Sequence, residues 1–582
     1  MNRFETPFNH FATPPPAPSH TLRLTDEQEA IIHTNYNLLI NACAGSGKTS
    51  TLIAYALQKQ VEAIAAGKTT RGLYLAYNRS VRLEAQDRFA RSGVHTIDVH
   101  TAHSLAYAHI MKGSRYKTGN NPAPYELVAQ LELTRYTRYD RMEATILARH
   151  ILSALTWFCN HNEPLAALDY PSLINPADRP MMKFVRKYHE PIMQLTQVLW
   201  EQMVAGERTI THDGYLKLFA LSCPKLRYDY ILFDEGQDAS PVMLQTMLAQ
   251  TTRLKSTTKL VVVGDRHQQI YGFRHAVNAL ENLSAEGGGN GTDFPTLGLT
   301  RSFRFGQPIA DLATRILSVK RAYNPTQRIT PIRGTPQGTP GFPGLSAVIG
   351  RTNFSVIGTA IKDLCIEQII GSVYFEGHLD TYTFMDQGAP LTELLALHRG
   401  RLNEVRNAHL QSFRGIDELK DYIDATGDKQ LAMAMELVET YQDELPHLIG
   451  QVRAAHMPLE GRASADQIYS TLHRAKGLEY AHLRINPDFV TWGQVDQTMQ
   501  RVRECRELSE SDQPVGAKRQ AEVNQKTRLL IAETDEEINM LYVAVTRARH
   551  VLDADEVIRN LVGTEAIPST GEKTACDQWW VL

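Results

Sequence analysis

Residues 42–49 read ACAGSGKT, and this glycine-rich segment restricts the fold of the chain more than any other feature. It overlaps the end of LLINACA, a short buried-strand pattern, and runs into TLIAYALQKQ, which has helical character. A strand, a glycine turn and a helix in this order open a βαβ unit. We therefore predict an α/β protein with open parallel sheets, whose ligands bind at the carboxyl ends of the strands.

The residue types of this segment predict a phosphate-binding loop. Gly45 and Gly47 allow backbone N–H groups to curl around phosphate oxygens, and the helix N-terminus adds its dipole. We expect Lys48 to reach the β and γ phosphates and Thr49 to hold Mg²⁺. A purely structural glycine turn is the alternative. The expected nucleotide-binding residues here are Ala42, Cys43, Ala44, Gly45, Ser46, Gly47, Lys48, Thr49 and Ser50.

A second acidic motif, FDEGQD, ends another strand pattern at residues 233–238. We expect Asp234 to hold Mg²⁺ through water and Glu235 to act as the general base that polarises the attacking water. Taken alone, the motif is equally compatible with a solvated acidic turn. Its occurrence together with the phosphate loop favours the catalytic interpretation.

Further strand patterns occur at GLYLAY (72–77), KLVVVG (259–264), LSAVIG (345–350) and EYAHLRI (479–485). Helical patterns fill residues 110–205 and 377–460, and GGGNG (287–291) and TPIRGTPQGTPGFPG (330–344) read as loops. We expect two α/β cores, each with a helical insertion. Residues 490–535 are charged and carry no assignment. The expected division is 1–21 as a disordered Pro-rich leader, 22–109 and 206–298 as core 1, 110–205 as its insertion, 299–376 and 461–582 as core 2, and 377–460 as its insertion.

Composition excludes several classes of protein. With 61 basic and 64 acidic residues among 582, the chain cannot coat nucleic acid through overall basicity, so any such site must be a local groove. The six cysteines form no CxxC pair, which argues against a structural zinc site and favours a reducing compartment. No apolar run approaches the length of a membrane span, and the N-terminus lacks the apolar region of a signal peptide.

Six motifs follow one another in the order of UvrD/Rep-type superfamily I DNA helicases, and the chain resembles that family from about residue 22 to 550. They are the phosphate loop, DEGQD, VVVGDRHQQIYGFR (261–274), LTRSFRFG (299–306), TLHRAKGLE (471–479) and EEINMLYVAVTRAR (536–549). AYNRS, DVHTAHSLAY and THDGYLKLF look most like the F-box DNA helicase branch. Since only about 20 residues precede the helicase region, we expect no F-box. The resemblance implies two RecA-like cores.

The resemblance also assigns roles around ATP. Gln28 would read adenine, although Thr25 and Gln28 also form the capping-box pattern of a helix start. Phe303, where the family has Tyr, would stack on adenine or else be a core aromatic. Gln268 would sense the γ-phosphate, and Glu479 would bind the ribose. Arg304 and Arg547 would neutralise charge on the γ-phosphate. Ser50 stands where UvrD has an arginine near the base, so we expect looser base selectivity.

For DNA, the resemblance implies contacts through hydroxyl, amide, imidazole and guanidinium groups that suit phosphate and sugar rather than base reading. Phe273 stands where the family usually has Trp and would be a base-stacking platform, unless it is a core residue. His103 and His473 are equally compatible with structural roles. The implied DNA-contacting residues are Asn78, Thr101, His103, Phe273, Arg351, Asn353, Thr471 and His473.

The function implied is an ATP- and Mg²⁺-dependent helicase or translocase that moves 3′→5′ on single-stranded DNA, in repair, recombination or replication. A bacterial or phage cytoplasmic origin is expected over a nuclear one. Three alternatives remain open. One is a translocase that strips proteins such as recombinase filaments from DNA with little unwinding. Another is a DNA-sensing ATPase subunit with a nuclease partner. The third, an ATP-dependent kinase or ligase, is disfavoured by the VAVTRAR motif. No membrane partner is expected.

Overall fold

The computed structural model describes residues 24–562, except 175–178, 253–255, 271–279, 281–282, 284–293, 336–344, 384–390, 408, 427–428 and 511–516. The expected leader at 1–21, the glycine run at 287–291 and Phe273 lie outside the described residues. No helix in the described part of the chain has both the length and the apolarity needed to cross a membrane.

A six-stranded parallel sheet forms the first core, in the order β3-β2-β4-β5-β1-β6. Its central strands are nearly continuous apolar runs because helices cover both faces, as in most parallel sheets. Its members are β1 (Leu38–Ala42), β2 (Gly72–Ala76), β3 (Ile97–Thr101), β4 (Tyr230–Phe233), β5 (Lys259–Gly264) and β6 (Thr296–Leu299), with flanking helices α1 (Asp26–Ile32), α2 (Lys48–Ala65), α3 (Arg79–Arg91), α4 (Ala102–Ile110) and α10 (Pro241–Thr252).

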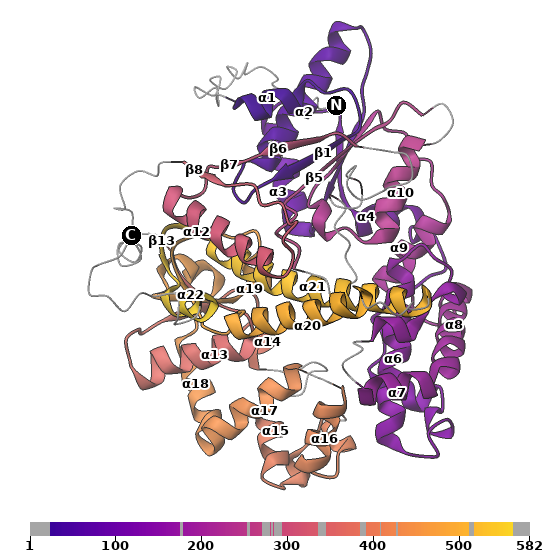
Figure 1. Cartoon of the computed structure of the whole chain (residues 1–582), viewed down its shortest axis with the longest axis vertical. Helices are drawn as coiled ribbons and strands as arrows, with labels where there is room; N and C mark the ends of the chain where they lie inside the picture. Colours follow the sequence, from indigo (N-terminus) through magenta and orange to yellow (C-terminus); the bar gives the residue numbers. More distant parts are fainter. Residues whose placement is uncertain are drawn as a thin grey trace, which may run out of the picture.

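A helical layer lies between α4 and β4 along the chain and descends from the first sheet in Figure 1. Its long helices α6 and α8 pack against each other through buried aliphatic side chains such as Ile151 and Leu199. The layer comprises α5 (Pro124–Gln130), α6 (Arg141–Asn160), α7 (Arg179–Lys187), α8 (His189–Ala205) and α9 (His212–Leu221).

The second core is a five-stranded parallel sheet in the order β10-β11-β9-β12-β13. Its strands are β9 (Ser346–Gly350), β10 (Val373–Phe375), β11 (Gln467–Thr471), β12 (Tyr480–Ile485) and β13 (Ala548–Asp553), with helices α12 (Gln307–Ser318), α13 (Asn353–Ile361), α19 (Leu472–Ala475) and α22 (Asp555–Val562). A second helical group, drawn in orange in Figure 1, comprises α14 (Asp380–Thr383), α15 (Leu391–His398), α16 (Ile416–Thr426), α17 (Lys429–Tyr441) and α18 (Leu445–Ala455).

Two long helices, α20 (Trp492–Glu510) and α21 (Ala517–Val545), occupy the segment that had no assignment. They pack along each other, with the buried hydroxyls of Thr498 and Thr534 2.8 Å apart, and extend across the middle of the molecule (Figure 1). The C-terminal part of α21 carries the last motif into the interface between the two cores.

The predicted α/β class with parallel sheets is confirmed. One local expectation is wrong: residues 330–344 were expected to be loop throughout, but β8 (Arg333–Gly334) pairs with β7 (Arg301–Ser302). Such a two-residue ladder leaves no periodic pattern that a sequence could reveal. The domain boundaries given above stay a prediction.

Candidate active site

The phosphate loop joins β1 to α2, and two glycines shape it. Gly45 and Gly47 have φ values of +72° and +78°, a left-handed conformation that side-chain-bearing residues rarely adopt. A Cβ on Gly45 would lie 2.5 Å from Cβ of Arg304, so glycine is also what permits the close approach of that chain. The loop is completed by Phe303, whose backbone N–H donates to the Gly45 carbonyl at 2.8 Å.

Lys48, the first residue of α2, forms an ion pair with Glu235 at 2.8 Å. Although burial lowers the pKa of Lys48, the charges of Glu235 and Asp234 raise it further, so the ammonium is firmly protonated. In this structure the lysine neutralises the second acidic motif. A phosphate placed in the loop would compete for the same cation.

Asp234 follows β4 and lies almost fully buried beside that pair. Tyr74 of β2 donates its hydroxyl to one carboxylate oxygen, and the Glu235 backbone N–H donates to the other at 2.9 Å. Burial, with a smaller contribution from the negative charge of Glu235, raises the pKa of Asp234 to about 6. A divalent cation would stabilise the ionised form of such a buried carboxylate.

Glu235 adopts a left-handed conformation with φ at +53°, which turns its side chain from the strand end toward the phosphate loop. Gln237 donates to its second oxygen. Burial raises the pKa of Glu235, but the charges of Lys48 and Lys476 outweigh burial and lower it to about 2. Glu235 is therefore ionised, and it becomes a stronger base when Lys48 leaves it.

The magnesium assignment fits the donor set around Thr49 and Asp234. Across the described residues, no three or more His, Cys, Asp or Glu side chains form a metal-binding cluster. Mg²⁺ is commonly held by one or two protein oxygens together with substrate phosphates, so such a cluster is not required. The Ser46 hydroxyl in the loop is buried and has no hydrogen-bond partner in the described structure, as a phosphate-facing group would be.

Asp265, immediately after β5, connects the loop to α21. Its carboxylate accepts hydrogen bonds from the side-chain amide of Gln268 at 2.9 Å and from the Tyr542 hydroxyl at 2.7 Å. That hydroxyl in turn accepts the backbone N–H of Ala44 at 3.2 Å. A residue of the second core thus reaches the phosphate loop directly.

Arg547 lies five residues after Tyr542 on the same chain and is 2% exposed. Its guanidinium donates to the Val543 carbonyl at 3.1 Å and to the side-chain oxygen of Gln268 at 3.5 Å. Burial and the nearby Arg304 lower the pKa of Arg547. An arginine remains charged in proteins, so this unfavourable burial makes the site receptive to an anion.

Arg304 and Glu479, expected to contact γ-phosphate and ribose, contact each other. Nε of Arg304 donates to Oε1 of Glu479 at 2.7 Å, and its Nη1 donates to the Thr546 carbonyl at 3.0 Å. Both residues border the loop from the side of the second core. Arg304 must exchange the carboxylate for phosphate if it acts on ATP.

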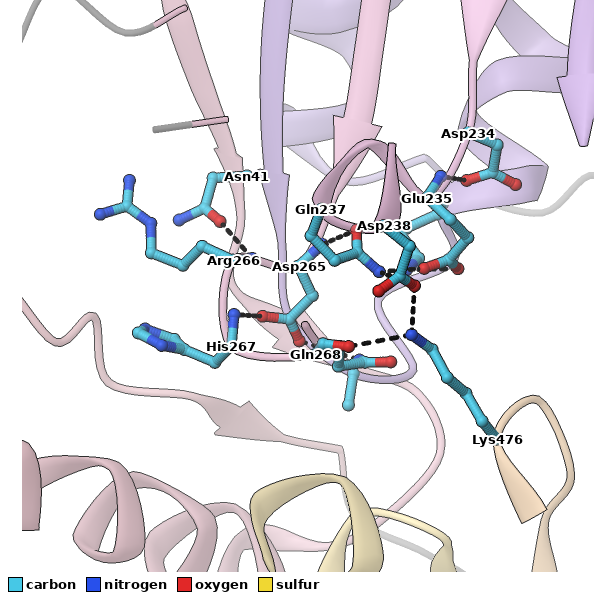
Figure 2. Close-up of polar contacts among 12 residues, drawn as sticks. Asn41, Asp234, Glu235, Gln237, Asp238, Asp265, Arg266, His267, Gln268 and Lys476 are labelled. Carbon is cyan, nitrogen blue, oxygen red and sulfur yellow. Dashed lines mark hydrogen bonds and ion pairs between the residues drawn. The ribbon is translucent and has the colours of Figure 1, made fainter. Parts of the chain in front are cut away.

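Three successive carbonyls of the first core accept hydrogen bonds from side chains of the second core. Lys476 donates to Gln268 at 2.9 Å, Asn539 to Gln269 at 3.1 Å, and the Nε2 of His473 lies 3.0 Å from the Ile270 carbonyl oxygen. Figure 2 shows Lys476 reaching from its own loop toward Gln268 and Asp238. Lys476 also forms an ion pair with Asp238. We call residues 268–270, held in this way, the inter-core clasp.

The residues expected to contact adenine lie near the phosphate loop. Gln28 is buried and completes the capping box with Thr25, and its amide also donates to Thr51 at 3.1 Å. Phe303 is 44% exposed beside Gly47, so it is not a core aromatic. The Ser50 hydroxyl accepts a hydrogen bond from Arg88 of α3 at 2.8 Å, which places an arginine near this end of the loop.

The expected DNA contacts occupy helix starts in both cores. Asn78 and Thr101 are the N-caps of α3 and α4, Thr471 is the N-cap of α19, and Asn353 begins α13. His103 lies 3.5 Å from Asp213. Arg351 forms a two-point ion pair with Glu537 of α21, and His473 contacts the inter-core clasp at the Ile270 carbonyl. DNA binding by these residues stays a prediction.

Sequence reasoning missed several residues of this site. The missed residues that contact the carboxylates and the phosphate loop are Tyr74, Asp265 and Tyr542. Those that bind the inter-core clasp are Lys476 and Asn539. Four of the five had a usable signal. Asp265 follows a strand pattern, Lys476 lies within TLHRAKGLE, and Asn539 and Tyr542 lie within EEINMLYVAVTRAR. Tyr74 had none, because an aromatic in a buried strand reads as core.

Comparisons with known proteins agree with this arrangement. Residues 24–285 match the UvrD/REP helicase N-terminal domain. F-box DNA helicase 1 of Gallus gallus is 28% identical over 565 residues, which cover 93% of this chain and 50% of that protein. F-box DNA helicase protein 1 of Schizosaccharomyces pombe (strain 972 / ATCC 24843) is 26% identical, covering 94% and 59%. DNA helicase IV of Escherichia coli (strain K12) is 26% identical over 344 residues, covering 54% and 49%. The chain thus spans about half to three fifths of the first two relatives.

Proposed function

The chain belongs to the UvrD/Rep-like superfamily I helicases, and we propose that it is an ATP-dependent motor that moves 3′→5′ along single-stranded DNA and separates the strands of duplex DNA. One observation supports this most strongly. Gln268 of the first core contacts Arg547 of the second, beside a phosphate loop that Tyr542 also touches. A nucleotide there would lie between the two cores, so its turnover would alter how they meet.

Hydrolysis begins with an exchange of partners. Lys48 leaves Glu235 for the β and γ phosphates, and the pKa of Glu235 rises because its nearest positive charge has moved away. Glu235 then accepts the proton of the attacking water. Thr49 and Asp234 would hold Mg²⁺, which when bound would supply positive charge to the phosphate oxygens. Arg304 and Arg547 neutralise the charge that develops on the γ-phosphate.

Coupling to movement follows from the inter-core clasp. Gln268 lies between Asp265 and Arg547, and the carbonyls of residues 268–270 are bound by the second core. A change in Gln268 on loss of the γ-phosphate therefore changes contacts across the interface. The single strand crosses the helix starts of both cores, near Asn78, Thr101, Asn353 and Thr471.

The remaining parts of the proposal rest on the family resemblance. They are a role in repair, recombination or replication, the 3′→5′ direction, single-stranded DNA and its junctions with duplex as substrates, and a nuclease or recombinase as a protein partner. The two cores and two insertions are proposed with the boundaries expected from the sequence.

A strand-displacement assay tests this function. Purified protein, ATP and Mg²⁺ are mixed with duplexes that carry a 3′ tail, a 5′ tail or no tail. We expect displacement from the 3′-tailed duplex only, and none by a Glu235→Gln variant. Displacement only from the 5′-tailed duplex would contradict the direction. No displacement with intact DNA-stimulated hydrolysis would favour a translocase without unwinding.

A further inference from the structure

The first sheet ends at β3, which pairs with β2 on one side and with no strand of the described residues on the other. The Thr96 carbonyl accepts a hydrogen bond from the Gly72 N–H at 2.8 Å, which fixes how β3 directs its backbone groups. Successive residues of a strand turn these groups to opposite sides, so Ile97 and Val99 direct their N–H and C=O groups away from β2. β3 therefore offers an edge to which an extended chain can add.

A groove of about 350 Å³ lies between this edge and α3. Residues 97–100 of β3 all line it. Side chains of neighbouring strand residues point to opposite faces of a sheet, so a groove that contacts four in a row follows the edge of the strand rather than one face. Phe89, Ala90 and Val94 give the groove an apolar wall beside the start of β3, since α3 runs antiparallel to that strand.

The other end of the groove carries hydrogen-bond donors. Arg82 and Gln86, about one turn apart on α3, line this end together with His100 of β3. The Nε of Arg82 is buried and has no hydrogen-bond partner in the described part of the chain. A buried donor without a partner costs free energy, so this wall favours a ligand that accepts hydrogen bonds and carries negative charge.

The groove contains one carboxylate, and other residues of the protein neutralise it. Asp98 accepts hydrogen bonds from Nη2 of Arg71 at 2.7 Å and from the Tyr228 hydroxyl at 2.9 Å. Arg82 takes part in no ion pair among the described residues. The uncompensated charge along the groove is therefore positive.

We propose that β3 and this groove bind an extended acidic segment of a partner protein, which adds to the first sheet as a further strand. Its backbone pairs with the outward groups of Ile97 and Val99, and its apolar side chains contact Phe89 and Val94. An Asp or Glu side chain of the segment accepts hydrogen bonds from Arg82. Backbone pairing supplies affinity, and the spacing of apolar and acidic side chains supplies specificity.

This docking site goes beyond the proposed function and does not depend on it. Its residues belong to α3 and β3 and take no part in the phosphate site. A partner held there would bring the chain to a place of work without changing the chemistry of hydrolysis. Binding of the segment and turnover of ATP can therefore be measured separately.

Fluorescence anisotropy with synthetic peptides tests the proposal. The acidic probe is fluorescein-Gly-Val-Thr-Val-Thr-Glu-Thr-Glu-Gly-amide, used with its reversed sequence because an added strand can run in either direction. One matched probe carries Lys in place of each Glu, and another carries N-methyl groups at alternate residues. We expect saturable binding of an acidic probe and at least about tenfold weaker binding of the lysine probe. The methylated probe should not bind, because it lacks the donors that pair with β3.

Three variants locate the contacts. Arg82→Gln removes the guanidinium and should weaken binding of the acidic probe about tenfold or more. Val99→Pro removes an N–H that points away from β2, so it should block the added strand and spare the existing ladder. Arg91→Gln, at an exposed position of the same helix outside the groove, should leave binding unchanged. Thermal melting checks folding, and Arg82→Gln keeps the test valid if Val99→Pro does not fold.

Amide hydrogen exchange shows where the probe binds. We expect exchange in residues 96–100 to slow when the acidic probe is added, because the outward N–H groups of Ile97 and Val99 become paired. The lysine probe should not slow it. Slower exchange confined to segments other than α3 and β3 would contradict the proposal.

Other results would also overturn the proposal. One is no saturable binding of either acidic probe, and another is wild-type affinity in both Arg82→Gln and Val99→Pro. Equal losses of single-stranded DNA affinity and probe affinity in Arg82→Gln would assign the groove to DNA. A dimer that Val99→Pro dissociates, seen by sedimentation, would make the occupant a second copy of this chain. DNA-stimulated ATP hydrolysis by Arg82→Gln should match the wild-type rate, so the motor function is judged independently.

Discussion

At the scale of single residues, the Lys48–Glu235 ion pair joins the residue proposed to bind the phosphates to the residue proposed as the general base. Lys48→Ala should lower the maximal rate of ATP hydrolysis by about 10²–10³ or more, because a cation at the developing charge is lost. Glu235→Gln should keep ATP affinity and lose turnover, since an amide cannot accept the proton of water. Steady-state hydrolysis with a fluorescent-nucleotide titration separates the two effects. Near-normal turnover in both variants would refute the site.

The Tyr542 hydroxyl connects the phosphate loop to Asp265, a polar contact that the apolar residues around Tyr542 do not predict. Tyr542→Phe removes the hydroxyl between Ala44 and Asp265, so Gln268 loses the support of a fixed Asp265. We expect kcat to fall about tenfold while KM for ATP changes little, because the phosphate loop itself is intact. A lower melting temperature together with a lower kcat and a raised KM for ATP would instead indicate that the hydroxyl only stabilises the fold.

The buried pair of Lys476 and Asp238 predicts a pH-dependent stability. Burial raises the pKa of Asp238 to about 6, and Lys476 opposes that rise. Lys476→Met removes the opposition, so the pKa of Asp238 rises further above its unfolded value. A carboxyl with a raised folded pKa loses stability as pH rises from about 4 through that pKa. We therefore expect the variant to lose more melting temperature at pH 8 than at pH 5. A loss independent of pH would contradict the pairing.

At the scale of elements, α21 concentrates the coupling. Asn539 binds the Gln269 carbonyl, Tyr542 binds the loop, and Arg547, just beyond the helix, binds Gln268. One element thus contacts three parts of the first core. The sequence allowed the prediction that Arg547, near the end of this helix, acts on ATP. The contacts of Asn539 and Tyr542 could not be predicted in this way, because they depend on the packing of two sheets that lie far apart in the sequence.

An alanine at Arg547 tests this element. The variant should lower kcat for ATP hydrolysis by about 10³–10⁵, as loss of an arginine finger does, with a much smaller effect on ATP affinity. Arg547→Lys retains a charge but not the planar fork, so partial activity is expected. Binding and turnover are measured on the same preparations. A loss of affinity at normal kcat would make Arg547 a binding residue only.

The sequence predicted elements better than contacts. The strands that precede acidic and glycine motifs, such as β1, β4 and β5, are strongly apolar and bounded by clear turn signals, so they were predictable. The α20–α21 pair was not, because its helices are charged and their apolar faces are narrow. Arg351 and His473 contact Glu537 and the Ile270 carbonyl, partners that the sequence did not predict, while their expected DNA contacts stay a prediction. No local pattern encodes which distant partner a polar side chain meets.

At the scale of the whole molecule, the two cores form one interface around a phosphate site. Buried polar contacts cross it at the loop, at Gln268 and at the inter-core clasp. A buried polar group that loses such a contact raises the free energy of the folded protein. The arrangement of the two cores seen here is therefore well defined only when all of these contacts form together. Under the proposed function, occupancy of the phosphate site would change the relative position of the two cores.

The most direct test of this account is the rate of ATP hydrolysis by the purified chain with and without single-stranded DNA, measured beside Glu235→Gln. The account predicts slow hydrolysis alone, a strong increase with single-stranded DNA, and no hydrolysis by the variant under either condition. Hydrolysis by wild-type protein at the same rate with and without DNA would contradict the coupling of the DNA surface to the phosphate site.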